Sequence, residues 1–580
     1  MRFRSKLAGA AAIAILAVAG MALARREPLP LRGDPSSRAL LVDDAETLVA
    51  LEARGLAFRD IVGREGVEAI VQAVTDDIAE STKDAKPDNP RRPFKPAWLT
   101  RGSFELVGLV NRLDRRVFDG ATCGEVRLVY RLAFAGKKRP TTRLPMTVNV
   151  RIPQPKPAGG DCRAVAQRWI GLQDLGEIAG SLARPAKIEI NFQSIHVPAS
   201  QQDMDDNAEY VMRAFDVAGS KVAPGLLFNT PRTDLDAAQR AKLLAWITAN
   251  ATAIDEGTAV VPDEFLASKI TSVSPRGLVH PQNRPFHALY PDPANAFAKV
   301  ALEGRTRATT PDLLLRRLDE MTCVGCHQTR GIAGFHLLGE ERNAKTTFNA
   351  LAVGHSPHLG ADLGWRSLDL ASAAKGERSA IRPFAAFPDG TYGSECGLTP
   401  GLAAWTCAAP LVCRSLHQRE WGVCSPPEGA RPGEPCEDVN VVADGRPNGA
   451  IVTSRGADKT CPAPTGGIPD GPFCAPNWLG FTGGMCSEAC THVGEIEGAS
   501  ICAPLPSAGY EADCFQSREP IEACLERHYT NARVARCDRS TPCRDDYGCA
   551  RVPGAPPGVG ACVPPYFIFQ ARVDGPLLDR

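Results

Sequence analysis

The sequence lacks an excess of charge of either sign, because 66 lysines and arginines stand against 66 aspartates and glutamates. A chain without net charge has no long-range field to attract nucleic acid, so we expect no nucleic-acid partner. The chain also lacks a P-loop, a G-x-S-x-G nucleophile elbow and an H-E-x-x-H helix. Their absence removes the usual signals of nucleotide binding, serine hydrolase chemistry and zinc proteolysis. Beyond the first 24 residues no apolar run reaches the ~18 residues of a membrane span, so we expect none in the mature chain.

One long apolar run is present at the N-terminus, from Leu7 to Leu23, and basic residues precede it. Ala22 and Ala24 supply the small side chains that a signal peptidase reads. The pattern predicts a secretory signal peptide over residues 1–24. An uncleaved membrane anchor is the alternative, since the run approaches spanning length. We therefore expect an exported protein, whether periplasmic, at the cell surface or extracellular.

The 20 cysteines are unevenly placed, and most of them lie between Cys396 and Cys562. Such a density in an exported chain is typical of a scaffold held by disulfides. We expect residues 396–580 to form a cysteine-rich repeat region of irregular structure and short strands. Two stretches carry the repeat, namely Cys407-x5-Cys413-x10-Cys424 followed by Ser-Pro-Pro, and Cys543-x5-Cys549-x12-Cys562 followed by Val-Pro-Pro. Spacing alone does not give the pairing.

Residues 25–305 combine helical periodicity with alternating strands, which predicts an α+β domain. The helical stretch over residues 43–82 is interrupted at Gly55 and Gly63. Residues 187–197 alternate as a half-buried strand, and residues 209–215 and 226–229 are further expected strands. We expect Thr233 to cap a helix that runs to about residue 252.

Two cysteines of this region, Cys123 and Cys162, both flank predicted strands. We expect them to form a disulfide, since the exported chain has no other cysteine nearby. Two separate buried thiols are the alternative.

Residues 306–395 differ in kind and are expected to form a small, mainly α-helical segment of a multidomain chain. Thr310, Pro311 and Asp312 predict a helix start, with a capping hydroxyl, proline at the first helical position and an acid in the first turn. The helix leads directly into Cys323-Val-Gly-Cys326-His327. Two cysteines at this spacing can form thioether bonds with the two vinyl groups of a haem. The histidine that follows is then placed to bind the iron.

At this motif the segment resembles the c-type cytochromes, over about 90 residues around the helix and the motif. The resemblance implies one covalent haem c, attached through Cys323 and Cys326, with His327 as axial ligand. It further implies that the exported protein transfers electrons to an unknown redox partner or carries out haem-based chemistry on peroxide or dioxygen. Elsewhere, residues 107–116 and 124–132 are similar only to segments of uncharacterised secreted bacterial proteins, which implies no function.

The sixth iron ligand departs from the pattern of many small c-type cytochromes, because no methionine lies between His327 and Cys396. A histidine or an open position remains. We favour His358, which lies far enough along the chain, in a predicted loop with His355, to reach the other haem face. His336 and His355 are the alternatives.

Two other interpretations of the motif remain open. Cys323 and Cys326 can form a local disulfide, or they can bind zinc together with two of the downstream histidines. In either case the protein is a non-enzymatic surface or matrix protein whose cysteine-rich region binds a surface component. A last candidate is the charged stretch Asn111–Arg115, which we interpret as a solvated turn rather than a binding turn.

Overall fold

The structure is a computed structural model of the whole chain, and part of the chain is described. The described residues are 38–82, 94, 96–134, 142–195, 208–274, 284–323, 337, 339, 357–378, 380–384, 389–390, 395–400, 403, 405–415, 421–425, 427, 473–475, 485–487, 536–538, 548–551, 555–556 and 558–563. The predicted signal peptide, residues 1–24, lies outside them.

An eight-stranded antiparallel sheet forms the centre of the described chain. Seven strands follow one another in sequence order, and the eighth pairs with β6 beside β7. The strands are β1 (Leu41–Val42), β2 (Ser103–Arg112), β3 (Thr122–Phe134), β4 (Thr142–Pro155), β5 (Lys187–Ile195), β6 (Ala208–Ala218), β7 (Lys221–Gly225) and β8 (Lys269–Ser274). The fold is therefore mixed, with helices around an antiparallel sheet, as the sequence predicts.

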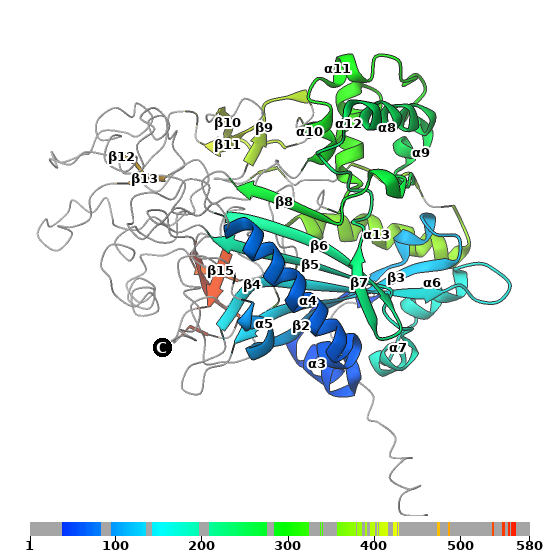
Figure 1. Cartoon of the computed structure of the whole chain (residues 1–580), viewed down its shortest axis with the longest axis vertical. Helices are drawn as coiled ribbons and strands as arrows, with labels where there is room; N and C mark the ends of the chain where they lie inside the picture. The colour runs from blue at the N-terminus through cyan, green and yellow to red at the C-terminus, as the bar shows by residue number, and fades with distance from the viewer. Residues whose placement is uncertain are drawn as a thin grey trace, which may run out of the picture.

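The two faces of this sheet differ because side chains alternate along each strand. Leu128, Val148 and Ile190 point to the first face and are fully buried in the main core. Arg127, Arg151 and Glu189 point to the second face. Helices of the N-terminal half pack on the first face (Figure 1): α3 (Ala45–Leu51), α4 (Phe58–Thr82), α5 (Ala97–Arg101), α6 (Arg163–Ile170) and α7 (Leu175–Ser181).

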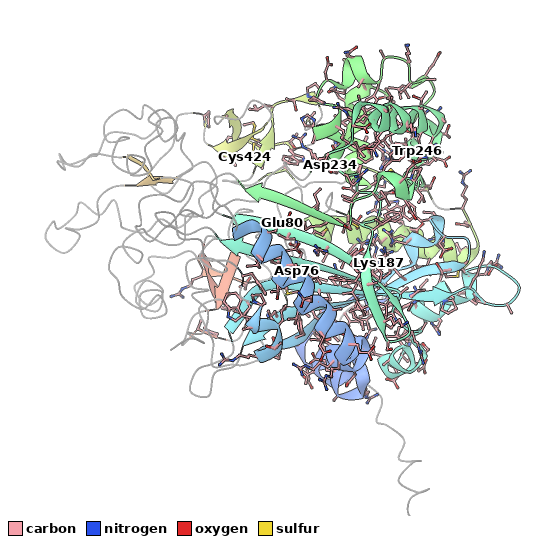
Figure 2. The ribbon with its side chains drawn as sticks, in the orientation of Figure 1. Asp76, Glu80, Lys187, Asp234, Trp246 and Cys424 are labelled. Carbon is pink, nitrogen blue, oxygen red and sulfur yellow. A yellow bond between two sulfur atoms is a disulfide. The ribbon has the colours of Figure 1, made fainter. Side chains whose placement is uncertain are left out.

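Ion pairs join α4 to the strands beneath it. The Lys269 ammonium on β8 lies 3.1 Å from Asp77 and 2.5 Å from Glu80, which Figure 2 labels on α4. Arg213 on β6 forms a bidentate pair with the same Asp77. The predicted interruption of this helical region is confirmed, since Gly55 and Gly63 have φ of 98° and 73°, a backbone conformation that suits glycine.

A second group of helices lies beyond the β8 edge of the sheet (Figure 1). It contains α8 (Ala237–Ala249), α9 (Ala251–Glu256), α10 (Pro285–Leu289), α11 (Pro293–Ala296) and α12 (Pro311–Glu320). They enclose their own core, which includes Leu243, Phe286 and Leu314. This core contains residues from both sides of position 305, and the predicted domain boundary there stays a prediction.

In this region the structure confirms one sequence expectation and contradicts two. The α12 start is confirmed, because Thr310 caps the helix and its Oγ1 accepts from the Leu313 N–H at 3.3 Å. The Thr233 cap is wrong. Asp236 begins α8 in a capping box with Gln239, where each side chain satisfies the other's backbone N–H. The strand expected at 226–229 is also wrong, since these residues form a loop.

The predicted Cys123–Cys162 disulfide is confirmed, with its Cα atoms 5.4 Å apart. Helix α13 (Pro357–Lys375) packs against α6 and against the 3-10 turn η2 (Leu113–Val117). The described part of the C-terminal region has only short strands: β9 (Glu395–Gly397), β10 (Val412–Ser415), β11 (Trp421–Ser425), β12 (Phe473–Ala475), β13 (Met485–Ser487), β14 (Arg536–Cys537), β15 (Gly548–Arg551) and β16 (Gly560–Val563).

Among the described residues, we find no helix whose length and apolar character would let it cross a membrane.

Candidate functional site

The first cysteine of the motif, Cys323, lies just after α12 and is anchored by its backbone. Its N–H donates to the carbonyl oxygen of Phe228 at 3.1 Å and to Oγ1 of Thr230 at 3.0 Å. Before it, the Thr322 hydroxyl donates to the Asp319 carbonyl oxygen at 2.7 Å and closes the last turn of the helix. The start of the motif therefore has a fixed place in the fold.

The loop that holds Cys323 depends on Asn229, which is fully buried. Asn229 has φ of 51°, a left-handed conformation that asparagine adopts more readily than most residues. Its Nδ2 donates to the Ala259 carbonyl oxygen at 2.9 Å, and its Oδ1 accepts from the Val261 N–H at 2.8 Å. These bonds fix the turn that directs the Phe228 carbonyl and the Thr230 hydroxyl toward Cys323.

A buried group of charged side chains lies on the second face of the sheet beside Cys323. We name it the Glu125 cluster, and its members are Arg115, Glu125, Arg127, Arg151 and Glu189. Three guanidinium groups surround the Glu125 carboxylate, with nitrogen–oxygen distances of 2.7 Å to Arg151, 2.8 Å to Arg127 and 3.3 Å to Arg115. Glu189 accepts from Arg151 at 3.0 Å. Arg127 and Arg151 face one another across β3 and β4, so the acids separate two like charges.

The cluster changes the pKa of its acids in a consistent direction. Burial alone would raise the pKa of Glu125, but Arg151, Arg127 and Arg115 lower it below its usual range. The pKa of Glu189 is also lowered, because Arg127 and Arg151 outweigh its burial. Both acids therefore stay ionised at neutral pH.

The Cys323 thiol is free and contacts this cluster. Its Sγ lies 3.7 Å from Oε1 of Glu189, close enough for a weak S–H···O hydrogen bond. Burial and the Glu189 charge raise the pKa of Cys323 to about 12. The sulfur is thus a protonated thiol at neutral pH, and it packs beside Met212 and Ala214.

Arg115 connects the cluster to the loop that anchors Cys323. Its guanidinium lies 4.3 Å from the ring centroid of Phe228 and 5.0 Å from that of Phe118. Burial, together with the nearby arginines, lowers the pKa of Arg115 to about 9, although Glu125 opposes the shift. One phenylalanine therefore carries both the carbonyl that binds Cys323 and the ring that contacts Arg115.

A second charged group lies next to the Glu125 cluster and joins α13 to the sheet. Asp114 accepts from Arg112 at 2.8 Å and from Arg382 at 3.3 Å, and Arg382 also donates to Asp362 of α13 at 2.7 Å. Arg366 pairs with Asp362 on the same helix. These contacts hold α13 over η2.

The interpretation of Asn111–Arg115 as a solvated turn is wrong. Asn111, Arg112 and Asp114 are buried, and the Arg115 side chain is only 12% exposed. Asn111 donates through Nδ2 to the Ala39 carbonyl oxygen at 3.0 Å, which pins the strand end. The stretch belongs to the interior of the site.

The remaining residues of the predicted haem site are placed only in part. Cys326, His327, His336 and His355 lie outside the described residues. His358 lies in the first turn of α13, so the loop predicted for it is wrong at this position. The next residue, Leu359, packs with Val107 and Val129 on the second face of the sheet.

The chain returns to the second face after the motif. Leu337 belongs to the same apolar cluster as Leu359, and the Gly339 carbonyl oxygen accepts from Nη1 of Arg131 at 3.1 Å. At Gly339, which has φ of 70°, an added Cβ would lie 2.4 Å from a Val107 methyl group, so glycine permits this close approach. The structure therefore brings Cys323, Leu337 and the start of α13 to one face.

No family model, curated protein or solved structure matches the chain. The site is therefore interpreted from its own chemistry.

In the C-terminal region, three other cysteines lie close enough together to share one metal ion. The sulfur atoms of Cys396, Cys407 and Cys424 lie within 4.8 Å of one another. All three are in disulfides, Cys396 with Cys413 and Cys407 with Cys424. A metal needs thiolate ligands, so the group can bind one only after reduction.

The Glu125 cluster is the part of the site that sequence reasoning missed. The strand over residues 125–132 alternates apolar and charged residues, which normally indicates one solvated face. The sequence did contain a signal, namely that the charged positions have both signs. Arginines and glutamates recur on the same face of neighbouring strands and can pair there.

Proposed function

We propose that this is an exported c-type haem protein that transfers single electrons or reacts with peroxide or dioxygen. Cys323 and Cys326 would hold the haem through thioether bonds, and His327 would be an axial ligand. The observation that carries the proposal is that Cys323 is a free thiol on the second face of the sheet, where its N–H donates to the Phe228 carbonyl oxygen and to the Thr230 hydroxyl.

The residues at this place fit a haem in two respects. A protonated thiol beside apolar side chains is suited to a thioether bond, which leaves a neutral sulfur in a buried place. The arginines of the Glu125 cluster can also pair with the carboxylates that a haem carries. Bound iron porphyrin would supply one-electron exchange, or oxygen and peroxide activation where the sixth position is open.

Of the three candidates for the sixth ligand, His358 is the one that lies within the described residues. His358 remains our preferred candidate, because α13 begins on the same face as Cys323. His336 and His355 are the alternatives. The chain's own contribution is to hold the motif, exclude water and set the charge around it.

The two alternative interpretations of the motif have less support. Cys323 is not in a disulfide, which argues against a local Cys323–Cys326 staple. Zinc binding would require the Cys323 thiolate, which burial and the Glu189 charge disfavour in the metal-free chain. A secreted surface protein remains the alternative for the cysteine-rich region, where disulfides support an interaction module.

Export is supported by the disulfides of the described chain. The bonds Cys123–Cys162, Cys396–Cys413 and Cys407–Cys424 are typical of a protein that folds in an oxidising compartment. Haem attachment to a C-x-x-C-H motif after export would be consistent with this location.

The test is an absorption spectrum of the full chain, purified after expression with an export signal and the haem-attachment machinery. We expect a Soret band, sharp α and β bands on reduction, and loss of covalent colour in Cys323→Ala with Cys326→Ala. His287→Gln, on α10, is the matched control and should keep the colour. A colourless wild-type protein with one equivalent of zinc would contradict the proposal and favour the surface protein.

A further inference from the structure

The Glu125 cluster has more positive than negative charge. Three arginines, Arg115, Arg127 and Arg151, share two acids, Glu125 and Glu189, and all five side chains are at most 16% exposed. Cys323 also contacts the cluster, through Glu189, and it is neutral as a thiol and would also be neutral as a thioether. One positive charge is therefore uncompensated within the cluster.

Among the described residues, the neighbouring side chains do not supply the missing negative charge. Arg112, the last residue of β2, adds to the positive potential at Arg115. The carboxylate that pairs with Arg112, Asp114, also pairs with Arg382. The rings of Phe118 and Phe228 contact Arg115, and aromatic faces stabilise a cation less than an anion does. An unpaired buried charge is costly, so such sites commonly take up a counter-ion.

We propose that Arg115 and the Glu125 cluster form a binding site for one carboxylate or small oxyanion on the second face of the sheet. The anion has two sources, a free anion or a carboxylate of the haem attached at Cys323. The second source rests on the proposed function, whereas the first does not. Guanidinium groups suit both, because they donate paired hydrogen bonds to planar carboxylates.

The first test uses the full mature chain prepared without haem, with sodium acetate replacing sodium chloride at constant ionic strength. We expect a saturable rise of about 2–4 °C in the unfolding temperature of the wild type, as for a ligand that binds only the folded state. Arg115→Gln should abolish the rise, and Arg115→Lys should keep part of it. The control is Arg64→Gln on α4, where the side chain is 91% exposed and the rise should persist.

The second test separates the sources by repeating the titration on the haem-loaded protein. Loss of the acetate effect identifies the haem carboxylate as the occupant, and persistence identifies a free anion. An equal response, or none, in the wild type and in Arg115→Gln without haem would overturn the proposal. Failure of haem attachment leaves the first test intact.

A second inference concerns the small C-terminal sheets and rests on a different observation, strand register. In the sheet β10-β11-β9, Cys413 lies opposite Cys424, and Cys396 lies opposite Gly422. In the sheet β14-β16-β15, Cys549 lies opposite Cys562, and Cys537 lies opposite Gly560. The two glycines precede the last cysteine of their unit by the same interval, so the paired cysteines and the glycine occupy equivalent register positions in the two sheets.

The disulfides of the first unit connect its cysteines in an alternating order. Cys396, the first, bonds with Cys413, the third, and Cys407, the second, bonds with Cys424, the fourth. The two cysteines that face each other across β10 and β11 are therefore not bonded to each other. Figure 2 shows Cys424 in this small sheet, which is separate from the eight-stranded sheet.

We infer that the second unit has the same connectivity, Cys537–Cys549 and Cys543–Cys562. Cys537 is itself disulfide-bonded. Each bond forms when two thiols lose two electrons and two protons to a protein disulfide of the export compartment, which becomes a dithiol.

Tryptic digestion without reduction tests this pairing directly, because an arginine separates each pair of neighbouring cysteines in this unit. Mass spectrometry should find residues 537–539 linked to 545–551, and residues 540–544 linked to 552–572. A link between 545–551 and 552–572, the pairing directly across β15 and β16, would overturn the inference. So would a link between 537–539 and 552–572.

Discussion

At the scale of single residues, the decisive feature is a neutral thiol placed beside ionised groups. Cys323 keeps its proton because its burial and the Glu189 charge both disfavour a thiolate. Arg151 and Arg127 act in the opposite sense, but they are already engaged with Glu125 and Glu189. The balance between Glu189 and the arginines of the Glu125 cluster therefore sets the reactivity of this cysteine.

Removing the Glu189 charge should make Cys323 more reactive. In Glu189→Gln the thiolate no longer faces an anion, and Arg127 and Arg151 are freed to stabilise it, so the pKa of Cys323 should fall. We expect the rate of iodoacetamide alkylation at pH 8 to rise about tenfold or more, because the thiolate is the nucleophile. Cys326→Ser in both proteins, prepared without haem, leaves Cys323 as the reporting thiol. A lower or unchanged rate would contradict the electrostatic account.

Asp319, on the last turn of α12, gives a prediction of stability against pH. Burial raises the pKa of Asp319 from 3.8 to about 7, although Arg284 and the Phe286 N–H oppose the shift. The unfolded chain therefore loses this proton first, and the free energy of unfolding falls as pH rises from about 4 to about 7.

Asp319→Asn removes that loss and keeps an oxygen that can accept from the Phe286 N–H, 2.9 Å from Oδ1. Relative to the wild type, we expect the variant to gain roughly 3–4 kcal/mol between pH 4 and pH 8, measured by urea unfolding. Asp234→Asn, on an exposed side chain, is the control. A constant difference between wild type and Asp319→Asn across this range would show that the aspartate is ionised in the folded protein.

At the scale of elements, local signals in the sequence were sufficient where the chain itself satisfies its backbone groups. Thr310 and Pro311 predicted the start of α12 because the capping bond lies within the helix. At α8 the cap predicted from the sequence was Thr233, which the structure does not use. Asp236 begins the helix because Gln239, three residues later, returns the bond to the backbone N–H of Asp236.

Substitutions at the observed cap, Asp236, and at the predicted cap, Thr233, should therefore have unequal effects. Asp236→Ala removes the bond to the Gln239 N–H, so we expect a loss of about 1 kcal/mol in the free energy of unfolding, measured by denaturant titration. Thr233→Ala, at an exposed position before the helix, should change stability by less than about 0.5 kcal/mol. The reverse order would mean that the helix begins earlier than the structure shows.

The contacts on the second face of the sheet could not be predicted from the individual elements. Alternation along β3 and β5 showed that charged and apolar side chains point to opposite faces. It does not reveal that Cys323, Gly339 and Leu359 cover the charged face, because those contacts join segments more than a hundred residues apart. The sequence therefore predicted the motif and its helix, whereas the Glu125 cluster beside them required the folded chain.

At the scale of the whole molecule, a large antiparallel sheet presents one face to a core of helices and the other to Cys323, Leu337 and the start of α13. The Cys123–Cys162 bond fixes the end of β3 to α6, and Arg116 on η2 pairs with Asp369 on α13. These bonds connect β3 to α6 and η2 to α13 around the sheet. The disulfide-bonded units follow later in the sequence, from residue 396 onward. Under the proposed function, the haem would lie on this second face.

The most direct measurement is the intact mass of the purified, exported chain after denaturation and extraction with acidified acetone, which removes haem that is not covalently bound. The account predicts the mass of the mature polypeptide plus one haem. The added mass should map to the peptide that contains Cys323 and Cys326. A mass equal to the polypeptide alone, from cells that attach haem to a control cytochrome, would contradict it.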